Sequence, residues 1–497
     1  MENKMKEFLE HLKKVDLLNS ASGLLGWDQN VNLPPKGIQS RSETQALLHS
    51  ISYDMFVSKE TEDFINALEN VRENLTDIEK TMLDETKKDF LKTKAVPKEL
   101  FEKRTKLTVS SQLSWQKARE ENNFSLFESN LKDILDVTKE IAEIYREKIY
   151  PELNNGYEAL MTEFEPGMKS EKIKEINADL QPFLTDLIEK IGDKGNSEIL
   201  KGKYGKDEQL EVSRFAIEKF GYDFEGGRMD LSTHPFTTGY ALGDVRLTTR
   251  VDENDFTDCF YSALHEGGHA IYEQGLPEKY AWTPIHAAAS FGIHESQSRL
   301  WENNVGRSRE FIKFIHPHLK KAFPGRLEVS DEELYAAINK VSPSFIRTEA
   351  DEVTYNLHIM LRFEIEIALF ENKIKVSELP EAWNDLMQKY LGITPPNNSV
   401  GVLQDVHWSW GMFGYFPSYM LGNLYAAQIF NSIEKNIPNL KSEIENGSFS
   451  NLKKWLNENI HSKGKMFTPD ILMEKATGET LNTTYFKNYL KNKYLGN

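Results

Sequence analysis

The stretch SALHEGGHAIYEQG, residues 262–275, limits what this part of the chain can fold into more than any other segment does. It contains the pattern H-E-x-x-H, with histidines at His265 and His269. On an α-helix these positions lie one turn apart on the same face, so two imidazoles can bind one zinc ion. Glu266 points away from that pair, so its carboxylate can reach a water molecule on the metal rather than the metal itself. The stretch therefore predicts a helix that carries a metal site.

The residues around the motif predict a helix in the core of the protein. Histidine is scarce, with 12 in 497 residues, so a chance match to this pattern is uncommon. Adjacent glycines in a helix interior cost about 1 kcal/mol each relative to alanine. Gly267 and Gly268 therefore indicate that another backbone or a substrate passes close to this turn. Apolar residues flank the motif on both sides: Ala263, Leu264, Ala270 and Ile271.

A catalytic zinc ion needs a third protein ligand and an open position for water. The next segment, AAASFGIHESQSRLWENN, offers His294 and Glu295 as neighbours, within a few tens of residues of the motif. That separation suits a second helix packed antiparallel to the first. Either side chain can bind zinc. We favour Glu295 as the ligand, and His294 would then line the substrate groove or hydrogen-bond to the metal ligands. Metzincins carry a third histidine six residues after the second. Here that position is Gly275, so the chain does not have the metzincin pattern.

Two later segments place polar residues among apolar ones. In SFIRTEADEVTYNLHIMLRFEIE, residues 347–352 are expected to start a long helix, and Arg347 pairs either with a structural carboxylate or with a substrate carboxylate. The segment GVLQDVHWSWGMFGYFPSYMLGNLYAAQ carries His407, Tyr415 and Tyr419. A histidine or tyrosine that donates a hydrogen bond near zinc would stabilise the oxyanion formed when water attacks a carbonyl.

Apolar residues at helical spacing dominate the rest of the chain, as in residues 5–15, 40–68 and 96–150. The clearest β signal lies between Met229 and Val251 and predicts a hairpin or short sheet. An edge strand there can bind an extended peptide, which makes His234 and Arg246 candidate substrate contacts. We expect a mainly α fold, organised as one peptidase unit over residues 1–497. Two lobes flanking a groove are one form of that unit, with the metal-site region at about 229–425.

Composition excludes several classes of protein. The net charge of −17 argues against a nucleic-acid partner, because such proteins normally carry a clustered basic face. The single cysteine, Cys259, excludes a disulfide framework within the chain and a zinc site of several cysteines. No apolar run approaches the roughly 18 to 20 residues of a membrane helix. These features predict a soluble, cytoplasmic protein with no membrane partner.

Taken together, six motifs resemble those of the carboxypeptidase Taq family of zinc metallocarboxypeptidases. In chain order they are HPF at His234, D-x-R-x-T at Asp244, HEGGH at His265, HESQ at His294, IR-x-x-AD at Ile346 and G-x-x-QD-x-HW at Gly401. The resemblance implies a large helical zincin-like peptidase with a long groove, commonly a homodimer, that binds Zn²⁺ or, as a substitute, Co²⁺.

The resemblance also implies roles for individual residues. It makes His265, His269 and Glu295 the metal ligands and Glu266 the general base. It implies that Arg347 holds the terminal carboxylate of the substrate. His407 and Tyr419 look similar to a pair that assists the carbonyl oxygen in related helical zinc peptidases.

The expected activity is hydrolysis of C-terminal residues from peptides, with a zinc-bound water attacking the scissile carbonyl. One alternative is an oligoendopeptidase with the same zinc site, which would not need Arg347. A second is a non-catalytic helical binding protein. Glu266 argues against the second, because binding a metal does not by itself require that carboxylate. No motif for binding a substrate's N-terminal amine is evident.

Overall fold

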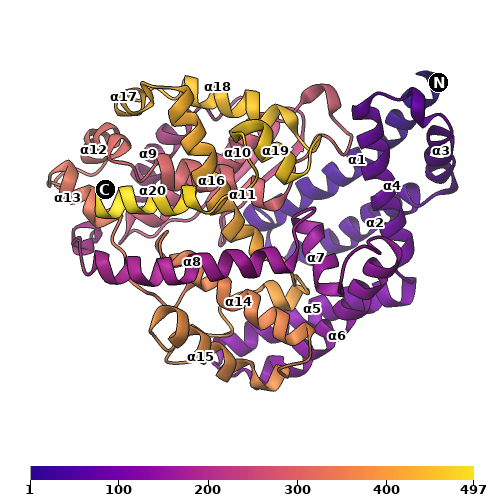
Figure 1. Cartoon of the computed structure of the whole chain (residues 1–497), viewed down its shortest axis with the longest axis horizontal. Helices are drawn as coiled ribbons and strands as arrows, with labels where there is room; N and C mark the ends of the chain where they lie inside the picture. Colours follow the sequence, from indigo (N-terminus) through magenta and orange to yellow (C-terminus); the bar gives the residue numbers. More distant parts are fainter. Residues whose placement is uncertain (1, 497) are drawn as a thin grey trace.

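The computed structural model describes residues 2–496 and is mainly helical, as the sequence predicted (Figure 1). The N-terminal helices lie at the right of Figure 1, and α8 runs across the front. The helices of the first half are α1 (Glu2–Val31), α2 (Ile38–Phe56), α3 (Lys59–Glu69), α4 (Asp77–Ala95), α5 (Lys98–Glu120), α6 (Ser125–Lys148), α7 (Gly156–Phe164), α8 (Ser170–Ile191) and α9 (Lys206–Phe220).

The first helix packs in a small core of its own. Met5, Phe8 and Leu12 are buried, as their helical spacing predicted, and they contact apolar residues of α3 and α4. The much larger main core extends from α5 to α20. The N-terminal helices therefore have a hydrophobic core that is separate from the core around the metal motif.

A small mixed sheet lies beside the metal motif. It consists of β1 (Gly227–Leu231), β2 (Thr237–Ala241) and β3 (Asp244–Thr249) in the order β1–β3–β2. β1 is parallel to β3 and β2 is antiparallel to it, so β2 is an edge strand. The predicted hairpin is confirmed, and the parallel strand β1 extends it into a sheet. Both β2 and β3 lie against α10, the helix of the metal motif.

The second half of the chain is helical and surrounds the motif. Helices α10, α11 and α16 lie near the centre of Figure 1. The helices are α10 (Phe256–Gln274), α11 (Phe291–Arg299), α12 (Arg309–Ala322), α13 (Asp331–Ile338), α14 (Tyr355–Phe370), α15 (Leu379–Leu391), α16 (Pro417–Asn436), α17 (Leu440–Glu445), α18 (Ser450–Asn459), α19 (Pro469–Thr477) and α20 (Thr484–Leu495). A π-helical turn, Leu300–Val305, continues α11.

The segment around Arg347 differs from the expected helix start. Arg347 lies in a short 3₁₀ turn, Arg347–Glu349, and α14 begins only at Tyr355. The Asp351 carboxylate accepts hydrogen bonds from the backbone N–H groups of Ser342 and Thr354, at 3.0 Å each. These bonds satisfy backbone groups that a helix would otherwise have to pair, so the irregular loop is stable.

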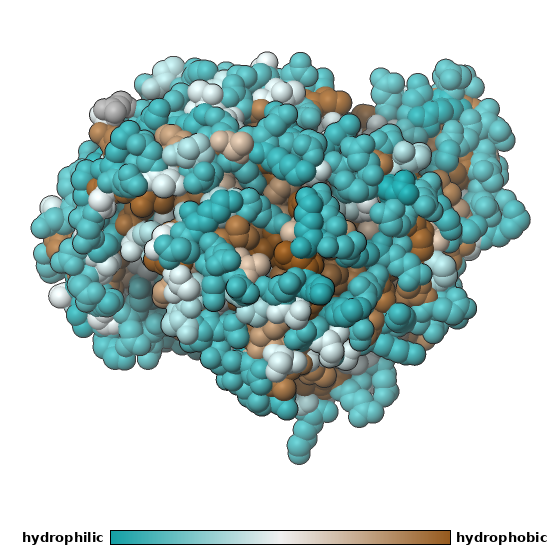
Figure 2. Space-filling view, turned by 60° about the horizontal axis from the view of Figure 1, so that its bottom comes forward, coloured by the Kyte–Doolittle hydropathy of each residue, from teal (hydrophilic) through white to brown (hydrophobic). Residues whose placement is uncertain are grey.

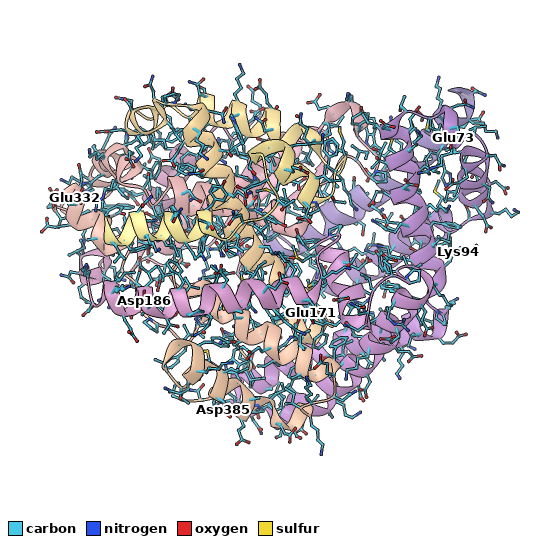
Figure 3. The ribbon with its side chains drawn as sticks, viewed as in Figure 1. Glu73, Lys94, Glu171, Asp186, Glu332 and Asp385 are labelled. Atoms are coloured by element: carbon cyan, nitrogen blue, oxygen red, sulfur yellow. The ribbon has the colours of Figure 1, made fainter. Side chains whose placement is uncertain are left out.

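The surface of the protein is dominated by charged and polar residues. Figure 2 shows one face on which hydrophilic residues predominate and hydrophobic ones gather in the middle. Exposed acidic side chains project from helices at opposite ends of the molecule, as Glu73, Glu332 and Asp385 do in Figure 3. Among the described residues, no helix is long and apolar enough to cross a membrane.

Candidate metal centre and active site

Helix α10 carries the H-E-x-x-H motif into the core. Its N-terminus is capped by Asp255, whose carboxylate accepts a hydrogen bond from the backbone N–H of Thr257 at 2.9 Å. At Gly268 the helix meets α11 directly, because a Cβ atom there would lie 2.6 Å from the carbonyl oxygen of Gln297. The prediction that another backbone passes close to the two glycines is therefore confirmed at Gly268.

The structure brings His265, His269 and Glu295 into one cluster. The Oε2 atom of Glu295 lies 3.5 Å from Nε2 of His265 and 3.4 Å from Nε2 of His269. One donor atom from each residue can be chosen so that all lie within 4.8 Å of one another. Zinc bonds of about 2.0–2.2 Å in a tetrahedron put neighbouring donor atoms roughly 3.4 Å apart. The donor set and its spacing therefore fit a zinc-like ion.

A third helix holds the carboxylate donor in place. Helix α16 contacts α11, and a Cβ atom added to Gly422 would lie 2.6 Å from the Cβ atom of Glu295. Only a glycine fits at that position. The neighbouring His294 turns elsewhere, since its Nε2 lies 2.8 Å from Glu273 Oε1 while its ring stacks on His269 at 4.3 Å. Glu295 thus lies among the donor atoms, and His294 packs against one of the other donors.

Buried charges surround the donor atoms. Nδ1 of His265 lies 2.8 Å from Oε2 of Glu302, on the π-helical turn after α11. Nε of Arg299 donates to Glu295 at 2.7 Å, and its Nη1 donates to Glu302 at 3.2 Å. A carboxylate on Nδ1 sets the tautomer in which Nε2 presents its lone pair to a metal. The sequence analysis did not single out Arg299 or Glu302.

The two motif histidines differ in their affinity for a proton. Burial disfavours charge on His265, but Glu295 and Glu302 outweigh it and raise its pKa to about 10. Burial, together with the nearby His294, lowers the pKa of His269 to about 3. The cluster therefore favours a positive charge next to Glu295, and a bound metal ion would supply it.

Glu266 lies next to the donor pair on α10, and its side chain is buried. Burial raises the pKa of its carboxyl group above the ordinary range. The Thr237 hydroxyl, at the start of edge strand β2, donates to Glu266 Oε2 at 2.7 Å and also lies 2.9 Å from the Glu266 carbonyl oxygen. Thr237 was not identified from the sequence, although it directly follows the HPF motif.

A second buried cluster forms around Asp405. Arg347 donates from Nε at 3.1 Å and from Nη2 at 2.8 Å to Asp405 Oδ1, while Arg362 Nε donates to Asp405 Oδ2 at 2.7 Å. Gln404 Oε1 accepts from the backbone N–H of Arg347 at 2.9 Å and from Arg362 Nη2 at 2.8 Å. Both guanidinium groups lower the pKa of Asp405 despite its burial. Two buried cations therefore share one carboxylate.

Tyr419 and His407 lie beside this cluster. The guanidinium of Arg347 lies 4.8 Å from the ring centre of Tyr419, and His407 Nε2 lies 3.2 Å from the Tyr419 hydroxyl. Burial lowers the pKa of His407 to about 3 and raises that of Tyr419 well above its ordinary value. Both side chains are therefore neutral at pH 7 and able to donate hydrogen bonds.

The remaining candidates make other contacts. Arg246 pairs with Asp244 at 2.7 and 2.9 Å and packs over Trp27 of α1. His234 is exposed, and its carbonyl oxygen accepts a hydrogen bond from Ser232 at 2.7 Å. The structure brings neither side chain into the group of metal-donor atoms.

A cavity of about 340 Å³ opens beside the sheet. It is bounded by α1, the β2–β3 turn and the C-terminal end of α10, and Glu273 lies in its wall. No metal donor is among the described residues that line it, and its link to the donors is indirect, through the contact of Glu273 with His294, which stacks on His269.

A mainly helical fold with a His-His-Glu donor set and an adjacent glutamate is typical of a metallopeptidase. The family model described as "Carboxypeptidase Taq (M32) metallopeptidase" matches residues 7–494. The chain belongs to this carboxypeptidase family, as the six sequence motifs indicated.

Individual relatives match over almost the whole chain. Carboxypeptidase 1 of Bacillus subtilis is 37% identical over 98% of this chain and 97% of its own length. The crystal structure of the M32 carboxypeptidase from Deinococcus radiodurans has a TM-score of 0.95 at 35% identity, over 99% of both chains. Metallocarboxypeptidase 1 of Trypanosoma cruzi has a TM-score of 0.94 at 33% identity, over 99% of this chain and 100% of that one.

Proposed function

We propose that the protein is a zinc-dependent carboxypeptidase that releases residues one at a time from the C-terminus of peptides. The observation that carries the proposal is the excess positive charge at Arg347 and Arg362, which share a single carboxylate, Asp405, among the described residues. A buried, uncompensated cation is costly, so the cluster favours an anionic partner. The terminal carboxylate of a peptide has the charge and the shape to fill that place.

Arg347 retains donors for such a ligand. Its Nη1 and Nη2 atoms each carry two N–H groups, and only one of each is used in bonds to Tyr355 and Asp405. Arg362 is fully buried, so it influences a substrate only through its hydrogen bond to Asp405. Arg347 is therefore the residue we assign to the substrate carboxylate.

Zinc suits the donor set of two imidazoles and one carboxylate at His265, His269 and Glu295, and Co²⁺ is the expected substitute. When bound there, the metal would lower the pKa of a water molecule and polarise the scissile carbonyl. The protein's own residues supply the remaining chemistry. Glu302 and Arg299 keep the donors oriented, and Thr237 holds the carboxylate of Glu266.

Glu266 is the general base in this proposal. It removes the proton from the attacking water and then delivers it to the leaving amine. Its raised pKa suits both steps, because a carboxylate closer to neutrality accepts and returns a proton more readily. His407 and Tyr419 are neutral donors for the carbonyl oxygen as negative charge develops on it.

The decisive experiment is a mass-spectrometric time course on one short peptide, prepared as the free acid and as the C-terminal amide. We expect stepwise C-terminal loss from the free acid and at most slow turnover of the amide, with both abolished by a chelator and restored by Zn²⁺. Internal cuts in both forms would instead identify an oligoendopeptidase and remove Arg347 from its role. A protein that binds zinc and cleaves neither form would be a non-catalytic binding protein.

Several broader assignments are part of the same proposal. We propose a homodimer in the cytoplasm, with residues 1–497 forming one peptidase unit and a long substrate groove. His234 and Arg246 are proposed substrate contacts near the edge strand. Light scattering on the purified protein tests the dimer, and a monomer across the working concentration range would contradict it.

A further inference from the structure

Tyr355 lies between the metal-donor cluster and the arginine cluster. It is the first residue of α14, and its side chain is buried. The guanidinium of Arg299 packs over its ring, 4.3 Å from the ring centre. Its hydroxyl oxygen accepts a hydrogen bond from Arg347 Nη1 at 2.9 Å. One aromatic ring therefore connects an arginine bonded to a metal donor with the proposed substrate anchor.

Both ends of this connection are fixed. On one side, Arg299 is hydrogen-bonded to the metal donor Glu295 at 2.7 Å. At Tyr355 itself, the backbone N–H donates to the carbonyl oxygen of Asp351 at 2.9 Å, and the Asp351 carboxylate fastens the preceding loop. The ring therefore has little freedom to shift toward or away from the metal donors.

The hydrogen bonds from Arg347 to Asp405 do not by themselves prevent the guanidinium from rotating. Its Nε and Nη2 atoms both bond a single oxygen, Oδ1 of Asp405, at 3.1 and 2.8 Å. Two bonds to one oxygen allow the planar guanidinium to pivot about that atom. The bond from Nη1 to the Tyr355 hydroxyl is a third point of attachment, and it opposes that rotation.

The geometry points to Tyr355 as a positioning residue that fixes Arg347 relative to the metal donors, and so sets release of one residue per cut. This inference rests on the proposed function, because it requires Arg347 to bind the terminal carboxylate. An extended peptide advances about 3.3–3.6 Å per residue. An anchor free to move by that length would let the peptide slide, and the scissile bond would change by one position.

The test is Tyr355→Phe, which keeps the ring under Arg299 and removes only the hydroxyl acceptor. The matched control is Tyr157→Phe, because the buried Tyr157 hydroxyl likewise bonds a buried ionisable group, the Glu366 carboxyl, at 2.9 Å. Both variants and the parent protein are loaded with zinc, and their metal content is measured. Each is then given one short peptide as free acid and as amide, with KM, kcat and product masses recorded.

We expect Tyr355→Phe to raise KM for the free acid about tenfold or more, since Arg347 loses the hydrogen bond that holds its guanidinium in place and must be ordered when the substrate carboxylate binds. Its kcat on the free acid and its slow turnover of the amide should match the parent protein, and dipeptides should appear among the products. Metal content should be unchanged, and Tyr157→Phe should behave as the parent does.

Three results would overturn the inference. In the first, Tyr355→Phe has the KM of the parent protein and releases single residues only. In the second, Tyr157→Phe shows the same rise in KM. In the third, Tyr355→Phe loses its metal. A parent protein that does not distinguish acid from amide would instead refute the proposed function before any variant is compared.

Discussion

Two buried charge clusters stand side by side, and they are incomplete in opposite senses. Around the metal donors, the carboxylates of Glu266, Glu295 and Glu302 outnumber the guanidinium groups of Arg299 and Arg307. Despite burial, this imbalance raises the pKa of His265 to about 10, so the cluster favours an additional positive charge at the donors. Around Asp405 the guanidinium groups of Arg347 and Arg362 outnumber the single carboxylate, and the cluster lacks an anion.

The difference teaches how a site of this kind can select its substrate. Unbalanced buried charge lowers stability unless a partner of opposite sign arrives. A metal ion would complete the first cluster, and a peptide carboxylate would complete the second. A peptide whose terminal carboxylate lies in the second cluster and whose last amide bond lies over the first satisfies both. Four single substitutions each disturb one cluster and leave the other intact.

The largest effect is expected from Glu266→Gln, which removes the proposed base without touching the donor atoms. Turnover of the free-acid peptide should fall by roughly 10²–10⁴-fold. Metal content should remain that of the parent protein, because Glu266 is not among the donors. Steady-state kinetics with elemental analysis on the same sample checks both points. Near-normal turnover in the metal-loaded variant would exclude Glu266 as the base.

Arg347→Ala disturbs only the second cluster. Losing a buried charged partner for the carboxylate costs about 2–5 kcal/mol of binding, or about 30-fold to several thousand-fold in kcat/KM for the free acid. Amide substrates, which lack that charge, should be processed as slowly as by the parent protein. Arg347→Lys is the informative companion, because it keeps the charge but not the forked geometry. Equal losses on acid and amide would mean that Arg347 is only structural.

Glu302→Gln disturbs the first cluster by weakening the hydrogen bond that orients His265. Partners of this kind typically change metal affinity 10–100-fold when mutated. Competition with a chromophoric chelator should show weaker zinc binding, while the acid-over-amide preference of the remaining zinc-loaded protein stays parental. Parental zinc affinity would show that Glu302 only fills space beside the histidine.

The smallest effect is expected from Thr237→Val, which removes the hydrogen bond to Glu266 at nearly constant volume. That bond favours the ionised carboxylate and so opposes the effect of burial. Without it, the pKa of Glu266 rises further, and the acidic limb of the pH dependence of kcat/KM should move to higher pH. The base must be deprotonated to act, which fixes this sign. A limb at the parental pH would show that Thr237 does not tune Glu266.

Part of the site could be predicted from the sequence because it depends on residues close together in the chain. The helix of His265 and His269 follows from spacing alone, and the glycine pair indicated a close backbone contact that occurs at Gly268. Glu295 was favoured over its neighbour His294 because carboxylates suit zinc. The small sheet was visible because its residues favour strands, although its parallel strand was not.

Other parts depend on contacts that no local pattern encodes. Glu302 faces His265 from a π-helical turn, where normal helical spacing no longer predicts which way a side chain points. Tyr355 reaches the site only because Asp351 holds the loop before α14, so the helix starts later than expected. The sharing of Asp405 by Arg347 and Arg362 joins residues far apart in the chain.

The direct contact of α10 with α11 at Gly268 bears on how fast the metal exchanges. Backbone meets backbone there, so an ion cannot pass between the two helices. The side chains of His265 and His269 keep 19% and 12% of their surface exposed, and an ion must come and go on that side. The substrate's carbonyl has to arrive on the same side. A bound peptide would therefore block the path of the metal. The half-life for release of the metal to a chelator should lengthen as a non-cleavable peptide occupies the site.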